Sequence, residues 1–232
     1  MIILSEIVNK NNKKYMLDKI IIPDDFKIKG GKIYAFFKRL FDIIASLIAI
    51  IVLSWLLIII AILVKCTSRG PAIYASQRVG KNGKIFKMYK FRSMYKDADA
   101  RLNELLKYNE TKGITFKMKN DPRVTKFGKF LRKSSLDELP QLFNIFLGQM
   151  SIIGPRAAIP REVEQYDDKM KLRLLVPQGL SGEWQTHGRS KTTFNDMINM
   201  DLEYIEKKRS FFYDIYLIFK TIFQVIFGRG AE

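Results

Sequence analysis

The strongest constraint on the fold of this chain is one long apolar segment. Residues 41–64 read FDIIASLIAIIVLSWLLIIIAILV, and Asp42 is the only charged residue among them. A helix rises about 1.5 Å per residue, so a helix of about 24 residues exceeds the roughly 30 Å hydrocarbon core of a bilayer. Length and composition therefore fit an ordinary membrane-spanning helix.

Positive charge on both flanks of this segment argues for a different topology. Basic residues precede it at Lys27, Lys29, Lys32, Lys38 and Arg39, and follow it at Lys65, Arg69, Arg78, Lys81, Lys84, Lys87 and Lys90. Lys and Arg mark the cytoplasmic side of a membrane segment, and a single span cannot place both of its ends there. A re-entrant hairpin can, and the hydroxyl of Ser54 near the middle could bond backbone groups freed by a bend. No Pro or Gly interrupts the segment, so the charge pattern leaves both topologies open.

The overall charge narrows the classes of partner. The chain carries a formal net charge of +17 over 232 residues, which implies nucleic acid, an acidic membrane surface or a phosphorylated substrate. His187 is the only histidine and Cys66 the only cysteine. A His-rich metal site, a mechanism with two imidazoles and an internal disulfide are therefore excluded. Residues 1–19 lack a long apolar run with a small-residue cleavage site, so we expect no cleaved signal peptide.

Beyond the apolar segment, the pattern predicts one domain without repeats. Residues 70–95 alternate like a β-hairpin with Asn82-Gly83 at its tip, and residues 96–109 and 195–208 have helical periodicity. The C-terminal stretch SFFYDIYLIFKTIFQVIFGRG is apolar and aromatic, with charges scattered through it. It fits a helix in the membrane interface and a core helix of the domain about equally well.

Two adjacent carboxylates, Asp137 and Glu138, stand out in the stretch SSLDELPQLFN, because a strongly basic segment precedes them. Pro140 has no backbone N–H and fits only the first turn of a helix, so we expect a helix to begin near Asp137. Asp is a favoured N-cap, and Ser135 with Glu138 fits a capping box. The local sequence therefore explains the pair as the start of a helix.

The same position also allows chemistry. Free N–H groups at a helix N-terminus favour a bound phosphate and an ionised carboxylate. With a divalent cation shielding the phosphates, the carboxylate of Asp137 could attack a diphosphate and form an acyl phosphate. The residues alone leave both interpretations of this aspartate open.

Basic residues in the loops are candidates for binding phosphate. They are Lys90, Arg92, Arg132, Arg156 and Arg189. Arg suits this role because its guanidinium makes paired hydrogen bonds to phosphate oxygens. Taken singly, each of these residues is more often a solvated surface charge, and the whole set could serve to attract anionic lipid.

Four long motifs occur in the order KRLFDIIASL, GPAIYASQRVGKNGKIFKMYKFRSM, DPRVTKFGKFLRKSSLDELPQLFNIFLGQMSIIGPR and GLSGEWQTHGRS. Together they resemble the bacterial sugar transferase family, the monotopic polyprenyl-phosphate phosphoglycosyl transferases. The resemblance runs from about Lys38 to the C-terminus and leaves about the first 30 residues uncovered.

This resemblance implies a specific reaction. Members of the family transfer a sugar 1-phosphate from a UDP-sugar to undecaprenyl phosphate, release UMP and need Mg²⁺. The phosphosugar is carried on the aspartate of an Asp-Glu pair. The resemblance thus implies Asp137 as nucleophile and magnesium ligand and Glu138 as its partner. It also suggests galactose or glucose as the sugar, in the first membrane step of capsule or exopolysaccharide synthesis.

The resemblance also implies substrate-binding residues and a fold. Candidates near the phosphates are Lys90, Arg132 and Arg156, and weaker candidates on the nucleotide side are Gln185 and Arg189. The expected fold is mainly α with a small β-hairpin. A re-entrant membrane helix at 32–66 and interfacial amphipathic helices pack on one cytoplasmic catalytic domain at 67–232. Residues 1–31 receive no role.

The implied location is the cytoplasmic face of the bacterial inner membrane, with anionic lipid as a partner. Nucleic acid is not an expected partner, and a homo-oligomer is left open. The main rival is a basic membrane-surface or nucleic-acid-binding scaffold without catalysis. Such a scaffold would explain the net charge, but it would not explain acidic residues at 137 and 138 between basic loops.

Three positions depart from the family pattern. Trp55 follows Ser54 where relatives usually carry Pro, which bears on the geometry of a bend. Ala157 follows the GPR motif where Pro is usual, and His187 occupies a position where we expect a small residue. We expect this histidine to pack or to hydrogen-bond rather than to catalyse.

Overall fold

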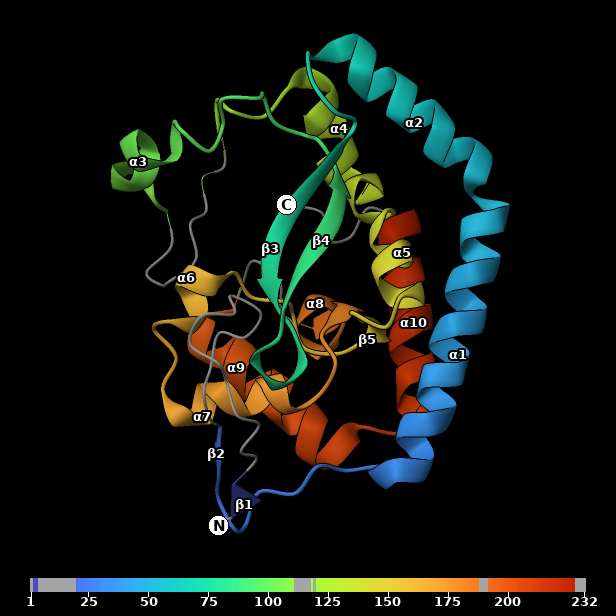
Figure 1. Cartoon of the computed structure of the whole chain (residues 1–232), viewed down its shortest axis with the longest axis vertical. Coiled ribbons are helices and arrows are strands. Elements are labelled where there is room, and N and C mark those ends of the chain that lie inside the picture. Colours follow the sequence, from blue (N-terminus) through green and yellow to red (C-terminus); the bar gives the residue numbers. More distant parts are fainter. Residues whose placement is uncertain (1, 4–19, 111–117, 119, 188–191, 228–232) are drawn as a thin grey trace.

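A long bent helix runs along one side of the molecule, and the other labelled elements lie on its inner side (Figure 1). The computed structural model describes residues 2–3, 20–110, 118, 120–187 and 192–227. The bent helix consists of α1 (Gly31–Val52) and α2 (Ser54–Thr67). The other α-helices are α3 (Leu102–Leu105), α4 (Lys126–Lys133), α5 (Gln141–Phe146), α6 (Pro160–Val163), α7 (Asp168–Lys171), α8 (Glu183–His187), α9 (Phe194–Glu203) and α10 (Phe211–Ile226). The predicted mainly helical fold is confirmed.

The strands form small separate sheets. They are β1 (Ile2–Ile3), β2 (Ile21–Ile22), β3 (Ile73–Val79), β4 (Ile85–Phe91), β5 (Ser151–Ile153) and β6 (Gly179–Ser181). β3 and β4 form the predicted antiparallel hairpin, with Tyr74 opposite Lys90. Its tip is the 3₁₀ turn η1 (Lys81–Gly83), in which Asn82 has a φ of 55° and Gly83 a φ of 76°. Asn and Gly tolerate this left-handed conformation, which is why they mark the tip in the sequence.

The bend in the long helix lies at Leu53, beside the predicted position. The two helices are bent by 64° there. No single helix in the described part of the chain is long and apolar enough to cross a bilayer, whereas α1 and α2 together are, by length and composition. The side chain of Ser54 is exposed and makes no hydrogen bond to a described residue. The prediction that its hydroxyl satisfies freed backbone groups is therefore wrong.

Packing explains a bend that contains neither Pro nor Gly. Leu53, at the bend, packs on the apolar cluster that includes Ile145 of α5. Ile60 and Val64 of α2 pack on a different cluster, which includes Leu131 of α4. Burial of apolar surface stabilises each contact, and the two clusters are made by different buried residues of the domain. The helix bends because its halves are held by different parts of the domain.

Two helical predictions have different outcomes. Residues 195–208 are helical as predicted, in α9 followed by the π-helical segment η6 (Tyr204–Lys208). The predicted helix at 96–109 is confirmed only in its second half: residues 96–101 form turns, and helix begins at Leu102, in α3 and the 3₁₀ segment η2 (Leu106–Tyr108). Among residues 96–102 only Ala98 is buried in the core, so little packing supports a regular helix there.

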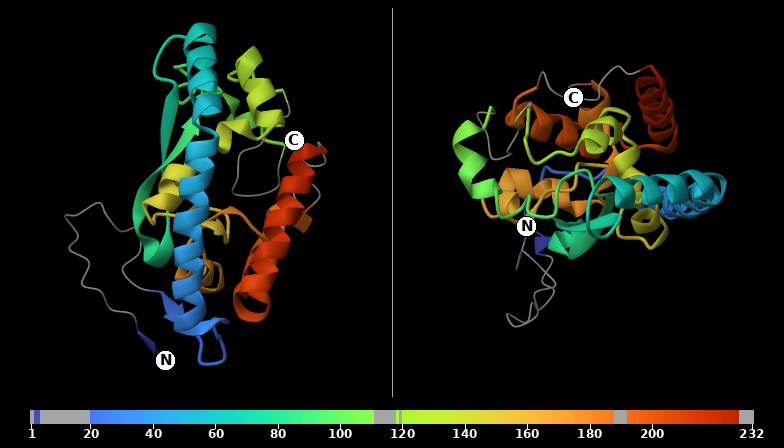
Figure 2. Two further views of the ribbon diagram at one scale, coloured as in Figure 1. Left: turned by 90° about the vertical axis from the view of Figure 1, so that its right-hand side faces the viewer. Right: turned by 90° about the horizontal axis from the view of Figure 1, so that it is seen from above.

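The C-terminal helix α10 has two contrasting faces. Asp214 and Leu217 are buried against the domain, whereas Phe212, Phe219 and Ile226 are 86%, 68% and 70% exposed. Figure 2 shows α10 beside the N-terminal part of α1. The inner face packs as a core helix does, and the outer face has the aromatic character expected of an interfacial helix.

Candidate active site

The acidic pair lies in a 3₁₀ turn, not at the N-cap of an α-helix. The turn η3 (Leu136–Glu138) follows Ser135, whose φ of 57° is left-handed. The regular helix α5 begins only at Gln141, after Pro140. Helical turns thus begin near Asp137 as predicted, but the capping interpretation is wrong. The side chain of Ser135 makes no capping hydrogen bond, and the carboxylate of Glu138 accepts a hydrogen bond from a lysine elsewhere in the chain.

That lysine is Lys90, near the end of β4, which brings the hairpin to the acidic turn. Its Nζ donates to Oε1 of Glu138 at 2.6 Å and lies 3.8 Å from Oδ2 of Asp137. The side chain of Asp137 is 10% exposed and that of Glu138 36% exposed. The two adjacent carboxylates therefore share Lys90 as a charge partner but differ in burial and in their distance from it.

These different surroundings separate the acidities of the pair. Burial raises the pKa of Asp137, an effect that Lys90 opposes and Glu138 strengthens. Burial also favours a higher pKa for Glu138, but the positive charges of Lys90, Arg156 and Arg78 outweigh it, and the pKa of Glu138 lies below its ordinary value. Adjacent carboxylates whose pKa values are shifted in opposite directions are typical of sites in which each carboxylate has a separate role.

Arg132 approaches the pair from α4. Its Nε donates to Oγ of Ser93 at 2.9 Å, and Asp137 is the strongest nearby charge that favours its ionised form. This contact is possible because α4 lies very close to the segment that follows β4. A Cβ added to Gly128 of α4 would lie only 1.9 Å from the carbonyl oxygen of Ser93. Only glycine at 128 lets α4 lie this near the end of the hairpin.

Arg156 approaches from the loop after β5. Nη1 of Arg156 lies 3.7 Å from Oε2 of Glu162, and its guanidinium lies 6.0 Å from the centre of the Trp184 ring. Arg173 donates to the carbonyl oxygen of Arg156 at 3.2 Å. Arg173 is itself paired with Asp201 in the interior. The backbone that carries Arg156 is therefore anchored to the core.

Two residues near the pair were not identified from sequence. In the sequence, Arg78 of β3 stood out only as one of many basic residues that flank the apolar segment. In the structure, its positive charge lowers the pKa of Glu138.

Asn144 of α5 is fully buried, and its side chain makes hydrogen bonds to the backbone of β4 of the kind that a neighbouring strand would make. It accepts from the backbone N–H of Tyr89 at 2.9 Å and donates to the carbonyl oxygen of Lys87 at 2.7 Å. These two hydrogen bonds tie α5 to the strand that carries Lys90. No local sequence signal marks Asn144 for this role.

Other candidates lie elsewhere. Arg92 donates to the carbonyl oxygen and hydroxyl of Ser68 at 2.6 and 2.9 Å, so it holds the C-terminal end of α2. Gln185 lies in α8, with its Oε1 near Gly182. His187 bonds Thr186 and the carbonyl of Glu183, in keeping with the hydrogen-bonding role expected for it. Arg189 lies outside the described residues.

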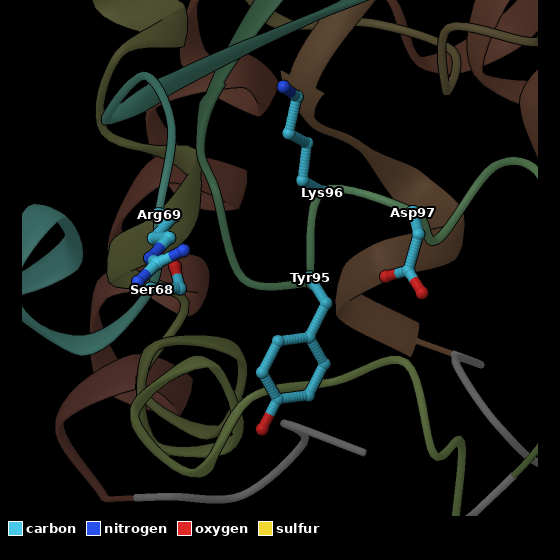
Figure 3. Close-up of a pocket in the computed structure, with 5 residues that line it drawn as sticks. All are labelled: Ser68, Arg69, Tyr95, Lys96 and Asp97. Carbon is cyan, nitrogen blue, oxygen red and sulfur yellow. The ribbon is translucent and has the colours of Figure 1, made fainter.

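A shallow pocket near the end of α2 is separate from the acidic pair. It has a volume of about 350 Å³ and is lined by Ser68, Arg69, Tyr95, Lys96 and Asp97. Figure 3 shows Ser68 and Arg69 on one chain segment and Tyr95, Lys96 and Asp97 on another. None of the candidate catalytic residues lines it.

The donor set around Asp137 is compatible with magnesium. Among the described residues no group of three or more His, Cys, Asp or Glu side chains could hold a metal ion by itself. Magnesium is usually held by one or two carboxylates together with substrate phosphates and water. Asp137 and Glu138 supply two carboxylates of this kind.

Comparison with known proteins identifies relatives over most of the chain. The model of the bacterial sugar transferase family matches residues 33–228. An undecaprenyl-phosphate galactose phosphotransferase of Salmonella typhimurium is 42% identical over 200 residues, which is 84% of this chain and 42% of the relative. A UDP-glucose:undecaprenyl-phosphate glucose-1-phosphate transferase of Klebsiella pneumoniae is 43% identical over 203 residues, 84% of this chain and 41% of the relative.

A shorter relative matches over most of its own length. The exopolysaccharide production protein ExoY of Rhizobium meliloti is 41% identical over 198 residues, 84% of this chain and 87% of the relative. The chain thus spans less than half of the two longer proteins and most of the shorter one.

Proposed function

Because this chain belongs to the bacterial sugar transferase family, we propose that it transfers a sugar 1-phosphate from a UDP-sugar to undecaprenyl phosphate and releases UMP. The products would be undecaprenyl-diphosphate-sugar and UMP, in the first membrane step of capsule or exopolysaccharide synthesis. The observation that carries this proposal is the buried carboxylate of Asp137, 3.8 Å from Lys90 and within the influence of the positive charge of Arg132. Such surroundings suit a nucleophile that must approach phosphate.

We assign the chemical steps to Asp137. One carboxylate oxygen attacks the phosphorus that bears the sugar, and the bond from that phosphorus to the oxygen of UMP breaks. UMP leaves with the bonding electron pair. A phosphate oxygen of undecaprenyl phosphate then attacks the same phosphorus, and the bond to Asp137 breaks to restore the carboxylate.

The neighbouring residues orient and neutralise charge in these steps. Lys90 is fixed by its 2.6 Å bond to Glu138, so its ammonium stays beside Asp137, where phosphate charge accumulates. Glu138 holds this lysine in place and remains ionised, because cations keep its pKa low. Arg132 and Arg156 would bind phosphate oxygens from opposite sides of the turn. Mg²⁺, when bound through Asp137, would neutralise phosphate charge and favour departure of UMP.

The sugar is proposed to be galactose or glucose. The Salmonella relative is named for galactose and the Klebsiella relative for glucose. The two sugars differ in the orientation of one hydroxyl, so their discrimination depends on a few polar contacts.

Purified protein incubated with labelled UDP-sugars, Mg²⁺ and undecaprenyl phosphate tests the function directly. We expect UMP release and a labelled lipid product with UDP-galactose or UDP-glucose. In the absence of lipid, we expect one equivalent of UMP and a labelled protein adduct. The scaffold rival predicts neither product, only polyanion binding that falls steeply as salt rises.

We further propose that α1 and α2 form a re-entrant membrane hairpin at the cytoplasmic face, with α10 in the interface. The basic residues on both sides of the apolar segment support this topology, as do the 64° bend and the exposed aromatic face of α10. Single cysteines at Lys32 and at Lys81, in a Cys66→Ser background, test it in intact bacterial cells. Both should be protected from a membrane-impermeant thiol reagent. Labelling of either one from outside would require a spanning helix instead.

A further inference from the structure

Arg78 of β3 is held in surroundings that its contacts with the protein do not satisfy. Its only hydrogen bond to a described residue runs from Nη1 to the carbonyl oxygen of Ala157, at 2.9 Å. Nε of Arg78 is buried without a partner among the described residues. A guanidinium carries several N–H donors, and burying them without acceptors costs free energy. A bound group with acceptor atoms would remove this cost.

A second cation, Arg156, makes it still less favourable for Arg78 to be charged in the absence of a ligand. Burial, followed by the nearby charge of Arg156, lowers the pKa of Arg78 to about 10. Two partly buried cations repel each other more strongly than they would in water. The negative charges of Glu162 and Glu138 offset part of this repulsion, and a bound anion would offset more of it.

The acids nearby are already engaged. Glu162 lies 3.7 Å from Arg156 and accepts a hydrogen bond from the backbone N–H of Ile159 at 3.1 Å. Glu138 is bonded to Lys90 at 2.6 Å. Neither carboxylate makes a hydrogen bond to Arg78 within the described residues, so its remaining donors stay available for a ligand.

The backbone fixes the two arginines relative to each other. Val79, next to Arg78, donates its N–H to the carbonyl oxygen of Ala158 at 2.9 Å, and these residues form an antiparallel bridge. Arg78 itself bonds Ala157, the residue after Arg156. Two guanidiniums on backbones joined in this way form a rigid cationic pair, which needs little reorganisation to bind an anion.

We propose that Arg78 and Arg156 together bind the diphosphate of the nucleotide sugar. The identity of this ligand rests on the proposed function. A diphosphate has enough acceptor oxygens for both guanidiniums, and its negative charge offsets their mutual repulsion. Because Arg78 and Arg156 also lower the pKa of Glu138, this pair lies on the glutamate side of the acidic turn. Arg132 is then left on the aspartate side.

Equilibrium binding of UDP measures this role without turnover. We expect Arg78→Gln to raise the Kd for UDP at least tenfold, and to raise the Kd for UMP by less because UMP lacks the second phosphate. Arg161→Gln is the matched control: it removes an exposed arginine of α6 and should change either Kd less than twofold. Equal Kd values for UDP in wild type and Arg78→Gln would overturn the proposal.

A conservative variant separates ligand binding from a structural role. Arg78→Lys keeps the charge and can still donate to the carbonyl of Ala157, so it should unfold at the wild-type temperature. It should nevertheless bind UDP several-fold more weakly, because an ammonium lacks the paired donors of a guanidinium. If Arg78→Gln fails to fold, this variant decides: a folded Arg78→Lys protein with the wild-type Kd for UDP overturns the proposal.

Assays of UMP release on the same preparations separate the two proposals. Wild type that binds UDP in an Arg78-dependent manner but releases no UMP from any UDP-sugar would refute the function and support the arginine pair. Wild type that turns over a UDP-sugar, with unchanged Kd and rate in Arg78→Gln, would refute the pair and support the function.

Discussion

The contact between α1 and α10 and the site around Asp137 both bury charged side chains, but they satisfy them differently. At the helix contact, Asp214 accepts hydrogen bonds from Tyr34, Lys38 and Tyr204 at 2.5, 2.6 and 2.6 Å. Nearby, Arg39 donates to the last carbonyls of α5 at 2.6 and 2.7 Å. Each charge has close partners within the protein.

At the acidic turn Lys90 and Glu138 pair closely at 2.6 Å, but the other charges have incomplete partners. Among the described residues, the closest cationic atom to Asp137 is Nζ of Lys90 at 3.8 Å, Arg156 lies 3.7 Å from Glu162, and Arg78 makes one hydrogen bond. A charge with close protein partners holds elements together, and removing one partner destabilises the fold. A charge with incomplete partners is available to a ligand. The comparison therefore separates residues expected to affect stability from residues expected to affect turnover.

The largest effect is expected for Asp137→Asn. An amide is neutral and cannot form the acyl phosphate, so lipid-independent UMP release should fall at least about 10³-fold. Unfolding temperature should change little, since Asp137 caps no helix. The decisive pair of measurements is thermal unfolding and UMP release on one preparation. Normal UMP release by a folded Asp137→Asn variant would show that the acidic pair has only a structural role in the turn.

The opposite pattern is expected for Asp214→Asn. The change leaves Lys38 buried without its counter-charge, which should lower the free energy of unfolding by about 3–5 kcal/mol in denaturant titrations. UMP release per folded molecule should stay close to wild type. The double variant Lys38→Met, Asp214→Leu should recover part of the lost stability, because both charges are removed together. A stable Asp214→Asn protein with impaired release would contradict the comparison.

A smaller effect on turnover is expected for Arg156→Lys. A lysine keeps the charge but lacks the paired donors of the guanidinium, so UMP release should fall about tenfold, which corresponds to about 1.4 kcal/mol of transition-state stabilisation. Arg161→Lys, on the exposed surface of α6, is the control. Wild-type turnover in Arg156→Lys would assign Arg156 to a surface role.

The smallest effect concerns pH. Asp137 must be ionised to act as a nucleophile, so the rate should fall as pH falls through its pKa, which burial places above the ordinary value for Asp. Lys90 lowers that pKa. In Lys90→Met the acidic limb of the profile for lipid-independent UMP release should therefore move to higher pH, in addition to a lower maximal rate. An acidic limb at the wild-type pH would show that Lys90 does not act on the ionisation of Asp137.

Much of the fold could be predicted from the sequence because the relevant signals are local. The apolar run at 41–64, the Asn82-Gly83 tip and the periodicity at 195–208 each depend on neighbouring residues and on the geometry of one element. The helix expected at 96–109 forms only from Leu102, because local periodicity cannot guarantee the packing that a short helix needs. The sequence also singled out the acidic pair and Lys90, Arg132 and Arg156 as candidate site residues.

The surroundings of that pair depended on contacts between distant segments. The sequence by itself determined that an Asp-Glu pair follows a basic segment, that the apolar helix has basic flanks, and that the chain resembles a family of sugar transferases. Tertiary structure decided that Lys90 bonds Glu138 rather than Asp137, that Asn144 replaces a strand partner, and that Arg78 lies beside Arg156. It also placed the bend at Leu53 without Pro or Gly. The physical reason is that propensity and periodicity act over a few residues, whereas these distances are set by how a hairpin, a turn and helices pack together.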